Sequence, residues 1–300
     1  MTLKHVVEDA LVGSGAAAVA GSRLRGRTLI LAYHNIVPDG AAAAGDRSLH
    51  LPRRVFAEQL DLVQAHCDVV ALAAVRDPGP PDGRPRVVLT FDDAYRGAVT
   101  CGVAELERRG LPATIFVAPA FIGGRSFWWD ALSTDADGGP PQALRERALE
   151  MLGGDDAAIR SAAAVDGAEA RAVPPALCAA SETELDEAAR YEGLSFGSHS
   201  WSHPNLATMT DVELAAELTR PLDWLRARYP RVAAWLSYPY GLSGPGTARM
   251  AERIGYRGAL EIGGGWVPRG GHAAFVLPRL NVPSGLSPAG LRLRLAGLFA

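Results

Sequence analysis

Two adjacent carboxylates follow an apolar run in the first half of the sequence. Asp92 and Asp93 come directly after Val87–Phe91, which has the composition of a buried β-strand. Neighbouring side chains at a strand end need not point the same way, so one carboxylate can face a metal ion while the other faces a water molecule. A helix N-cap uses the same residue type, because Asp is favoured there. This motif alone leaves a catalytic and a capping role equally open.

Two histidines follow a second apolar run. His199 and His203 come after Leu194–Ser198, and their spacing of four puts both imidazoles on one face of a helical turn. Two histidines and one carboxylate, with one position open, are a common ligand set of hydrolytic zinc sites. Single pairs of this kind also occur in cores and on surfaces. The combination with Asp92 and Asp93 favours a metal centre.

A rigid turn follows a third run. Ala234–Tyr238 predicts a strand, and the next residues are Pro239, Tyr240 and Gly241. Pro fixes φ and Gly permits an unusual backbone conformation, so such a turn can direct a backbone N–H outward. A tight turn with packed tyrosines would have the same sequence.

These motifs belong to a longer alternation of strand and helix patterns. Helical patterns cover Pro52–His66, Gly97–Arg109 with a C-cap at Gly110, and Asp211–Tyr229 with a cap at Thr210 or Asp211. Strand followed by helix followed by strand predicts a parallel α/β sheet. The predicted strands are Thr28–Tyr33, Val87–Phe91, Ala113–Val117, Leu194–Ser198, Ala234–Tyr238 and Gly258–Ile262.

The alternation stops between Asp130 and Arg190, where Ala, Asp, Glu and Gly dominate and no strand pattern occurs. We interpret residues 131–190 as a mainly helical insertion. An insertion after a barrel strand would overhang the carboxyl ends of the strands, where substrates bind. A lid and a passive decoration are both compatible with this pattern.

Composition narrows the class of partner. The 300 residues carry a formal net charge of −3, which offers no field for gathering nucleic acid or anionic lipid, so a neutral substrate is expected. Cys67, Cys101 and Cys178 are odd in number and scattered, which indicates neither a disulfide framework nor a thiolate zinc site.

The N-terminal residues 1–27 are interpreted as a helical extension. Ala10–Gly21 is rich in small residues, as the middle of a signal peptide is, but Glu8 and Asp9 lie where a signal peptide has positive charge. We therefore expect a surface helix here and a cytoplasmic protein, rather than a secreted or periplasmic one. No run of 18 or more apolar residues occurs in the sequence, so no membrane span is expected.

Three motifs in order resemble those of the polysaccharide deacetylase family, also called the NodB-homology or carbohydrate esterase family 4 fold. They are Thr90-Phe91-Asp92-Asp93-Ala94-Tyr95, His199-Ser200-Trp201-Ser202-His203-Pro204 and Tyr238-Pro239-Tyr240-Gly241. Shorter matches resemble a bacterial branch associated with surface-polysaccharide assembly: Tyr33-His34, Phe127-Trp128-Trp129-Asp130 and Leu277-Pro278-Arg279-Leu280-Asn281-Val282. The resemblance covers roughly residues 28–130 and 190–285. It implies a distorted (β/α)7-type barrel in a catalytic domain of residues 28–300.

The resemblance also implies roles for individual residues. Asp93, His199 and His203 would bind a divalent metal, most often zinc, and Asp92 would be the general base. Such a metal lowers the pKa of its bound water and polarises the acetyl carbonyl. The metal and the backbone N–H of Tyr240 would stabilise the oxyanion.

Two positions depart from the better-studied members. Ser237 stands where those members have an Arg, and Arg279 stands near the place of a His that acts as general acid. We hypothesise that Arg279 takes over the ion pair with Asp92 and keeps it ionised. His34 is then a candidate general acid on chemistry and barrel position, and it is equally a candidate structural or substrate-contacting residue. His272 is a weaker candidate, and His5, His50 and His66 are expected on the surface.

The aromatic cluster before the insertion is a candidate sugar-binding wall. Apolar faces of sugars lie well on indole rings, so Trp129 and its neighbours Phe127 and Trp128 are suited to stacking, although core packing would also use them. Asp130 is a candidate contact to a sugar hydroxyl or a catalytic side chain, or a helix cap. Together with Tyr240 and Pro239, Trp129 and Asp130 form the predicted substrate-binding set.

The sequence therefore predicts a metal-dependent hydrolase that removes N-acetyl groups from a hexosamine-containing polysaccharide or its precursor. An amide or cyclic-imide hydrolase acting on a small non-sugar substrate is the alternative within hydrolases, and removal of an O-linked acetyl is a further one. A catalytically silent glycan-binding protein is the alternative outside enzymes. The sequence does not predict the oligomeric state.

Overall fold

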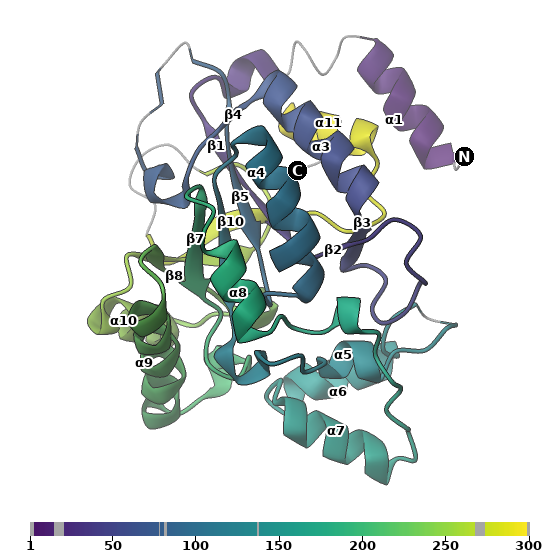
Figure 1. Cartoon of the computed structure of the whole chain (residues 1–300), viewed down its shortest axis with the longest axis vertical. Coiled ribbons are helices and arrows are strands. Elements are labelled where there is room, and N and C mark those ends of the chain that lie inside the picture. Colours follow the sequence, from purple (N-terminus) through teal and green to yellow (C-terminus); the bar gives the residue numbers. More distant parts are fainter. Residues whose placement is uncertain are drawn as a thin grey trace.

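A computed structural model of the chain describes residues 3–14, 21–77, 79–80, 83–136, 138–267 and 274–298. Within these residues, seven parallel strands close into a barrel in the order β1, β10, β9, β8, β7, β6, β5, because β1 pairs with β10 on one side and with β5 on the other. The predicted α/β barrel with a mainly helical insertion is confirmed (Figure 1). The barrel strands are β1 (Thr28–Tyr33), β5 (Arg86–Phe91), β6 (Ala113–Val117), β7 (Leu194–Ser198), β8 (Val232–Ser237), β9 (Gly258–Ile262) and β10 (Leu277–Asn281).

The closing pair β1 and β5 is buried throughout. The two strands are in register from Thr28 opposite Arg86 to Tyr33 opposite Phe91, and every residue of both strands is buried. Strands covered on both faces have continuous rather than alternating apolar sequences, which is why these runs were recognisable. Three shorter strands lie outside the ring: β4 (Asp68–Val69) pairs with β5, while β2 (Asn35–Val37) and β3 (His50–Pro52) form a separate parallel pair.

Amphipathic helices cover the outside of the barrel. The helix α3 turns Phe56, Leu60 and Val63 inward, and the ring of Phe56 meets that of Tyr33 in β1 edge to face at 5.2 Å. Apolar stripes of this kind are what hold helices to a sheet. The helices are α1 (Leu3–Gly13), α3 (Arg53–His66), α4 (Val103–Arg109), α5 (Trp128–Ala131), α6 (Gln142–Glu150), α7 (Asp156–Val165), α8 (Glu182–Ala188), α9 (Asp211–Arg228), α10 (Pro245–Ile254) and α11 (Pro288–Leu295).

Local sequence signals explain where these helices begin and end. A capping box of Thr210 and Glu213 opens α9, and Gly110, in the left-handed conformation at φ 64°, ends α4 as predicted. The helix predicted over Gly97–Arg109 has a π-helical first part, Ala98–Gly102. A side chain at Gly97 would lie 2.3 Å from the carbonyl oxygen of Ile36, so this segment packs directly on β2.

The predicted N-terminal helix over Ala10–Gly21 is described only at its two ends. Its first residues belong to the helix Leu3–Gly13, which begins earlier than predicted, and Gly21 is helical, while residues 15–20 lie outside the described residues. The helix α1 packs against α11, so it is fixed to the C-terminal part of the domain. Among the described residues, no helix has the length and apolar content needed to cross a membrane.

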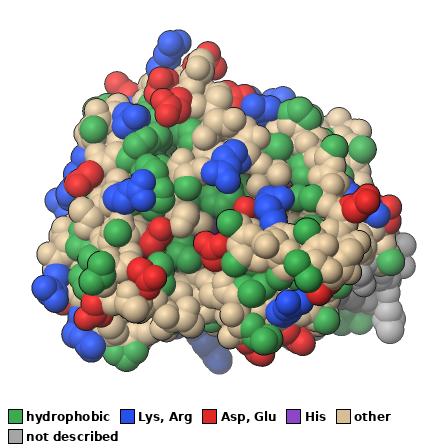
Figure 2. Space-filling view, turned by 90° about the horizontal axis from the view of Figure 1, so that it is seen from below, with side chains coloured by type: hydrophobic (Ala, Val, Ile, Leu, Met, Phe, Trp, Pro, Cys, Tyr) green, Lys and Arg blue, Asp and Glu red, His purple; other side chains and the backbone are tan. Residues whose placement is uncertain are grey.

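The insertion lies at one end of the molecule. Figure 1 shows α5, α6 and α7 together at the lower end, away from α1, α3 and α11. Between β6 and β7 the described residues form helices and turns without a further strand, as the sequence pattern predicted. Seen from this end in Figure 2, hydrophobic side chains gather toward the middle of the face, and basic and acidic side chains are scattered around them.

Candidate metal centre and its pocket

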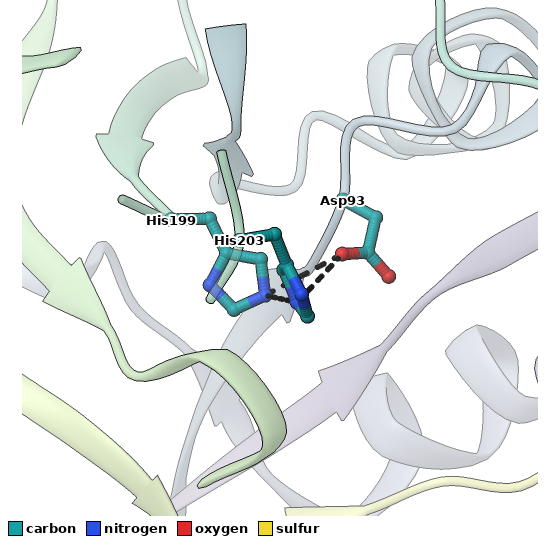
Figure 3. A group of neighbouring side chains, drawn as sticks. All are labelled: Asp93, His199 and His203. Carbon is teal, nitrogen blue, oxygen red and sulfur yellow. Dashed lines mark hydrogen bonds and ion pairs between the residues drawn. The ribbon is translucent and has the colours of Figure 1, made fainter. Parts of the chain in front are cut away.

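Three predicted ligands meet at the carboxyl ends of two strands. The Nε2 atoms of His199 and His203 lie 3.2 Å apart, and they lie 3.5 and 3.4 Å from Oδ1 of Asp93. Figure 3 shows the three side chains pointing toward one common point, Asp93 from the loop after β5 and the histidines from the loop after β7. All three are buried, so few water molecules can screen their interaction.

The geometry fits a tetrahedral divalent ion. Ligand atoms at about 2.0–2.2 Å from zinc are about 3.4 Å apart in a tetrahedron, which matches the three separations in this cluster. The buried Oδ1 of Asp93 has no hydrogen-bond partner within the described residues. Burial, followed by repulsion from Asp92 and Asp130, raises the pKa of Asp93 well above its usual value. A cation would relieve this arrangement, because a bound ion reverses the cost of a buried carboxylate.

The orientation of His199 is set by the neighbouring strand. Its Nδ1 lies 2.8 Å from the carbonyl oxygen of Ser237 at the end of β8, so Nδ1 carries the proton and donates it. This leaves Nε2 as an unprotonated lone pair facing Asp93 and His203. Hydrogen bonds of this kind fix the tautomer of metal-binding histidines and raise their basicity.

The loops that carry these residues have left-handed backbone conformations. Asp93, Ser200, His203 and Tyr240 have φ of 69°, 60°, 60° and 58°. Non-glycine residues in this region cost about 1–3 kcal/mol each, and they persist where the surrounding structure determines them. Of the six non-glycine residues with positive φ in the described part of the chain, five, including Ala94, lie in the three motifs, and the sixth, Ala234, lies in β8.

Asp92 is held by a single buried arginine. Arg279 on β10 donates from its two terminal nitrogens to the two carboxylate oxygens of Asp92, at 2.8 Å each, and one of these nitrogens also donates to Ser237 Oγ at 2.7 Å. The predicted ion pair is therefore confirmed. Burial alone would raise the pKa of Asp92, but Arg279 outweighs it and holds the pKa below its usual range. Asp92 is ionised at neutral pH.

A pocket of about 320 Å³ opens over these residues. It is lined by the ends of β1, β5, β7, β8, β9 and β10 and by the insertion, so the insertion does contribute to the site. Sequence reasoning missed several of the lining residues, because they lie in loops and helices without a motif. The missed residues are Asp46, Ser48, Leu49, Arg145 and Leu149. Gly241, Ile262 and Asn281 lie in sequence patterns that were recognised, but they were not assigned to the pocket.

Asp130 holds other residues in place instead of lining this pocket. Its side chain is fully buried, Oδ1 accepts from the backbone N–H of Asp46 at 2.8 Å and lies 2.9 Å from His50, and Oδ2 accepts from Tyr95 at 2.7 Å. The predicted contact to a sugar hydroxyl is thus not where the structure places Asp130, since its side chain is fully buried and absent from the lining of this pocket. The expectation of a surface His50 was wrong, because its hydrogen bonds bring it inside.

The aromatic cluster divides between core and pocket. Phe127 is fully buried and stacks on Trp129 with ring centroids 4.6 Å apart, while Trp128 and Trp129 line the pocket. Trp129 lies 5.1 Å from the ring of His203 and donates through its indole N–H to Tyr95 at 2.7 Å. Its edge is therefore fixed before any substrate binds.

The turn after β8 connects the barrel to the insertion. The hydroxyl of Tyr240 donates to the carbonyl of Gly154 at 2.9 Å and accepts from the indole N–H of Trp128 at 3.1 Å. A Cβ on Gly154 would lie 2.5 Å from the Tyr240 ring, so only glycine allows this approach. Tyr240 lines the pocket as predicted, whereas Pro239 is buried and absent from the lining. Pro239 shapes the turn and does not face the substrate space.

His34 lies in the same pocket as the cluster. It follows β1, it lines the pocket with His199 and His203, and burial lowers its pKa to about 4. At neutral pH its ring is neutral, so it can donate a proton as imidazolium only after receiving one. Of the other histidines, His66 is on the surface as expected. His272 and the side chain of His5 lie outside the described residues.

The fold and site place the chain in a class. A closed parallel barrel with ionisable side chains at the carboxyl ends of its strands is the architecture of barrel enzymes, whose chemistry occurs at that face. The sequence profile of the polysaccharide deacetylase family matches residues 79–259, which is more than half of the chain. The protein belongs to this family of deacetylases, and the resemblance noted from the motifs is confirmed.

Solved structures with the same fold are distant in sequence. A deacetylase from Streptococcus pyogenes, PplD, in complex with acetate, is 17% identical, with 90% of this chain and 98% of that chain covered at a TM-score of 0.60. IcaB from Ammonifex degensii is 19% identical, covering 90% and 97% at 0.61. BC0361, a polysaccharide deacetylase from Bacillus cereus, is 14% identical, covering 90% and 69% at 0.64. At these identities the likeness concerns the fold. No curated protein matches the chain significantly.

Proposed function

We propose that the protein is a metal-dependent hydrolase that removes an N-acetyl group from a hexosamine unit of a polysaccharide or of its precursor. The observation that carries this proposal is one constellation. Three convergent ligands, Asp93, His199 and His203, lie beside Asp92, a carboxylate that Arg279 keeps ionised, and all of them line or border one pocket.

Asp93, His199 and His203 would hold the ion, for which zinc is the first candidate given two nitrogen ligands and one oxygen ligand. When bound, it would supply a water of lowered pKa, from about 15.7 toward about 7, and would polarise the acetyl carbonyl. Three protein ligands would leave at least one coordination position of the ion for a water or a substrate oxygen.

Asp92 is suited to receive the proton of the attacking water. Each of its oxygens accepts one hydrogen bond from Arg279 and keeps a lone pair for a second donor. The guanidinium also fixes the plane of the carboxylate, so the base does not have to reorient during the reaction. Ser237, in the place of the arginine of better-studied members, supports this arrangement by accepting from Arg279.

Tyr240 and His34 would complete the reaction. The backbone N–H of Tyr240, on the turn after β8, is assigned to the oxyanion, and a donor of this kind contributes up to about 3–4 kcal/mol to transition-state stability. His34 is assigned to protonation of the leaving amine, since it is the remaining histidine of the described pocket lining. Because its ring is neutral, it would pass on the proton that Asp92 takes from the attacking water.

The size and lining of the pocket support a single sugar ring as the reacting unit. A volume of about 320 Å³ is at the lower end of small-molecule pockets. Trp128, Trp129 and Tyr240 offer aromatic surface to the apolar face of a sugar, and a chain of net charge −3 suits a neutral substrate. The cytoplasmic location expected from the N-terminus stays a prediction, and it would favour a precursor as substrate.

The experiment is metal analysis combined with acetate release from a panel of N-acetylhexosamine substrates. We expect about one metal per chain and acetate release from the wild type, metal without turnover in Asp92→Asn, and loss of both in His199→Ala. The matched control is His66→Ala, which removes an exposed histidine and should change neither quantity.

The same panel separates the alternatives. Metal without acetate, together with hydrolysis of small amides or cyclic imides, would identify the non-sugar hydrolase. Metal and glycan binding without turnover on any acylated sugar would identify the binding protein. A wild type without metal, in which His199→Ala changes nothing, would contradict the proposal.

A further inference from the structure

The loop that carries both histidines is fastened by one carboxylate outside the pocket. Ser200, Trp201 and Ser202 separate His199 from His203. Glu217, on α9, accepts from the backbone N–H groups of Trp201 and Ser202 through Oε2, at 2.9 Å each, and from the Ser202 hydroxyl through Oε1 at 2.7 Å. Three donors from two consecutive loop residues therefore end on a single side chain.

The hydrogen bonds to Glu217 hold the loop backbone in a conformation that non-glycine residues rarely adopt. Ser200 and His203 are both left-handed, at φ 60°, so the loop stores conformational energy at the residues on either side of the pair that Glu217 holds. The released loop would be free to relax toward ordinary φ values. Because the two histidines sit at its ends, relaxation would move their Nε2 atoms apart.

The other contacts of the loop do not replace Glu217. His203 N–H donates to Ser200 Oγ at 3.0 Å, which is a bond within the loop, and the carbonyl of Trp201 accepts from Ala120 N–H at 3.0 Å. The guanidinium of Arg220, one turn after Glu217, lies 4.0 Å from the centroid of the Trp201 ring. The N–H groups of Trp201 and Ser202 have Glu217 as their acceptor, so loss of that carboxylate leaves two half-buried donors unpaired.

We propose that Glu217 is a positioning residue for the metal centre, and that it sets metal affinity by holding the backbone between the two histidine ligands. This inference rests on the metal site of the proposed function but not on the identity of the substrate. Outer hydrogen-bond partners of metal ligands typically change affinity by about 10–100-fold when they are removed. Glu217 would act one step further out, through the main chain.

The test measures zinc dissociation constants of metal-free full-length protein by competition with a chromophoric chelator. We expect Glu217→Ala to weaken zinc binding at least about tenfold. Glu217→Gln keeps an acceptor for the N–H groups and should stay within about threefold of the wild type, since Ser202 Oγ can accept from the new amide. With saturating zinc, kcat of Glu217→Ala should return toward the wild-type value.

A control on the same helix separates this role from general stability. Glu213→Ala removes the capping box of α9 without touching the histidine loop, so it should lower the melting temperature and leave zinc affinity unchanged. If Glu217→Ala does not fold, Glu217→Met, which fills the same space without offering an acceptor to the two N–H groups, replaces it and should also weaken zinc binding.

Wild-type zinc affinity in Glu217→Ala, or in Glu217→Met when that is used, would overturn the inference. An equal loss of affinity in Glu213→Ala would overturn it as well, because helix stability would then account for the effect. A wild type that binds zinc but releases no acetate would refute only the proposed function. A wild type that binds no zinc would refute both.

Discussion

Two buried carboxylates of this protein, Asp92 and Glu105, are both held by arginines, and the number of arginines differs. Asp92 has Arg279 alone, whose side chain is fully buried. Glu105, on α4, receives Arg53 from α3 and Arg108 and Arg109 from its own helix. The two carboxylates thus offer a comparison between a pair at a pocket and a cluster between helices.

The surroundings of the two groups are opposite in one respect. Around Glu105, three arginines share one carboxylate, so the negative charge of Glu105 is compensated locally. Arg109 is also paired with Asp61. A second carboxylate, Asp93, lies beside Asp92. Burial and repulsion from neighbouring carboxylates raise the pKa of Asp93. In the cluster between helices, the carboxylate is paired with arginines. At the pocket, one carboxylate has no cationic partner among the described residues and could be neutralised by a bound metal ion, as is common at functional sites.

The largest expected effect comes from removing the single partner of Asp92. Arg279→Met leaves a buried carboxylate without its cation, which should cost about 3–5 kcal/mol of unfolding free energy. Urea unfolding of metal-free protein measures this difference. The double variant of Arg279→Met with Asp92→Asn should regain part of the loss, because it buries no unpaired charge. A single variant within about 1 kcal/mol of the wild type would contradict the dependence of Asp92 on Arg279.

Substitution of His34 should lower the catalytic rate without lowering the free energy of unfolding. His34→Gln keeps a polar side chain of similar length at the pocket, and loss of a general acid should lower kcat by about 10²–10⁴-fold. Steady-state acetate release measures this effect, and the unfolding free energy should stay near that of the wild type. A kcat within a few-fold of the wild type would assign His34 to substrate contact or structure instead.

The helix cluster should show its effect in acid. Burial acts to raise the pKa of Glu105, but hydrogen bonds from Arg109, Arg108 and Arg53 outweigh it and lower the pKa from 4.5 to about 2. A depressed pKa contributes stability that is complete above about pH 4.5 and is lost as the pH falls toward 2. Glu105→Gln should therefore be about 1.5–3 kcal/mol less stable than the wild type at pH 7, with the gap closing in that acid window.

Unfolding measured from pH 7 down to pH 2.5 tests this dependence. The control is Glu58→Gln, which breaks an exposed ion pair with Arg54 and should give a gap that is small at every pH. If the difference in unfolding free energy between Glu105→Gln and the wild type stayed constant from pH 4.5 toward pH 2, the lowered pKa of Glu105 would not be the source of that difference.

The smallest effect is expected where one of three arginines is removed. The side chain of Arg108 is 61% exposed, and Glu105 keeps Arg53 and Arg109 without it. Arg108→Ala should lower the unfolding free energy by less than about 1 kcal/mol. The loss of unfolding free energy in Arg108→Ala is compared with the loss in Arg279→Met in the same urea experiment. A smaller loss in Arg108→Ala would show that a carboxylate with three arginines depends less on each of them than a carboxylate with one. Equal losses in both would remove the distinction between pair and cluster.

Much of the barrel and the metal cluster was predictable from the sequence. The strand over residues 28–33 was predicted to the residue, because a strand buried on both faces is a nearly continuous apolar run. The strand over 194–198 was also predicted to the residue, although in it Leu194 and Phe196 alternate with small residues. Parallel strands bring their carboxyl ends to one edge, so Asp93 and the histidines were expected together. Arg279 was paired with Asp92 from the absence of an arginine at Ser237.

The remainder depended on contacts that no local pattern encodes. Asp46 and Arg145 reach the pocket from a loop and from the insertion, and they pair with each other across 99 residues of sequence. His50 was expected on the surface, but it lies in β3, where Asn35 is 3.2 Å from its Nδ1 and Asp130 is 2.9 Å from its Nε2. Glu217 looks like any charged residue of an amphipathic helix until its hydrogen bonds to the histidine loop are seen.

Closure of the barrel through β1 has a consequence for the order in which the protein becomes functional during synthesis. The ribosome releases Asp93, His199 and His203 well before β10, so the three cluster residues are available early. The partner of Asp92 is on β10, which is the last strand of the ring to emerge and which closes it against β1. A nascent chain that stops before β10 therefore carries the three cluster residues with an open barrel and an unpaired Asp92, and completion of the ring coincides with completion of the ion pair between Asp92 and Arg279.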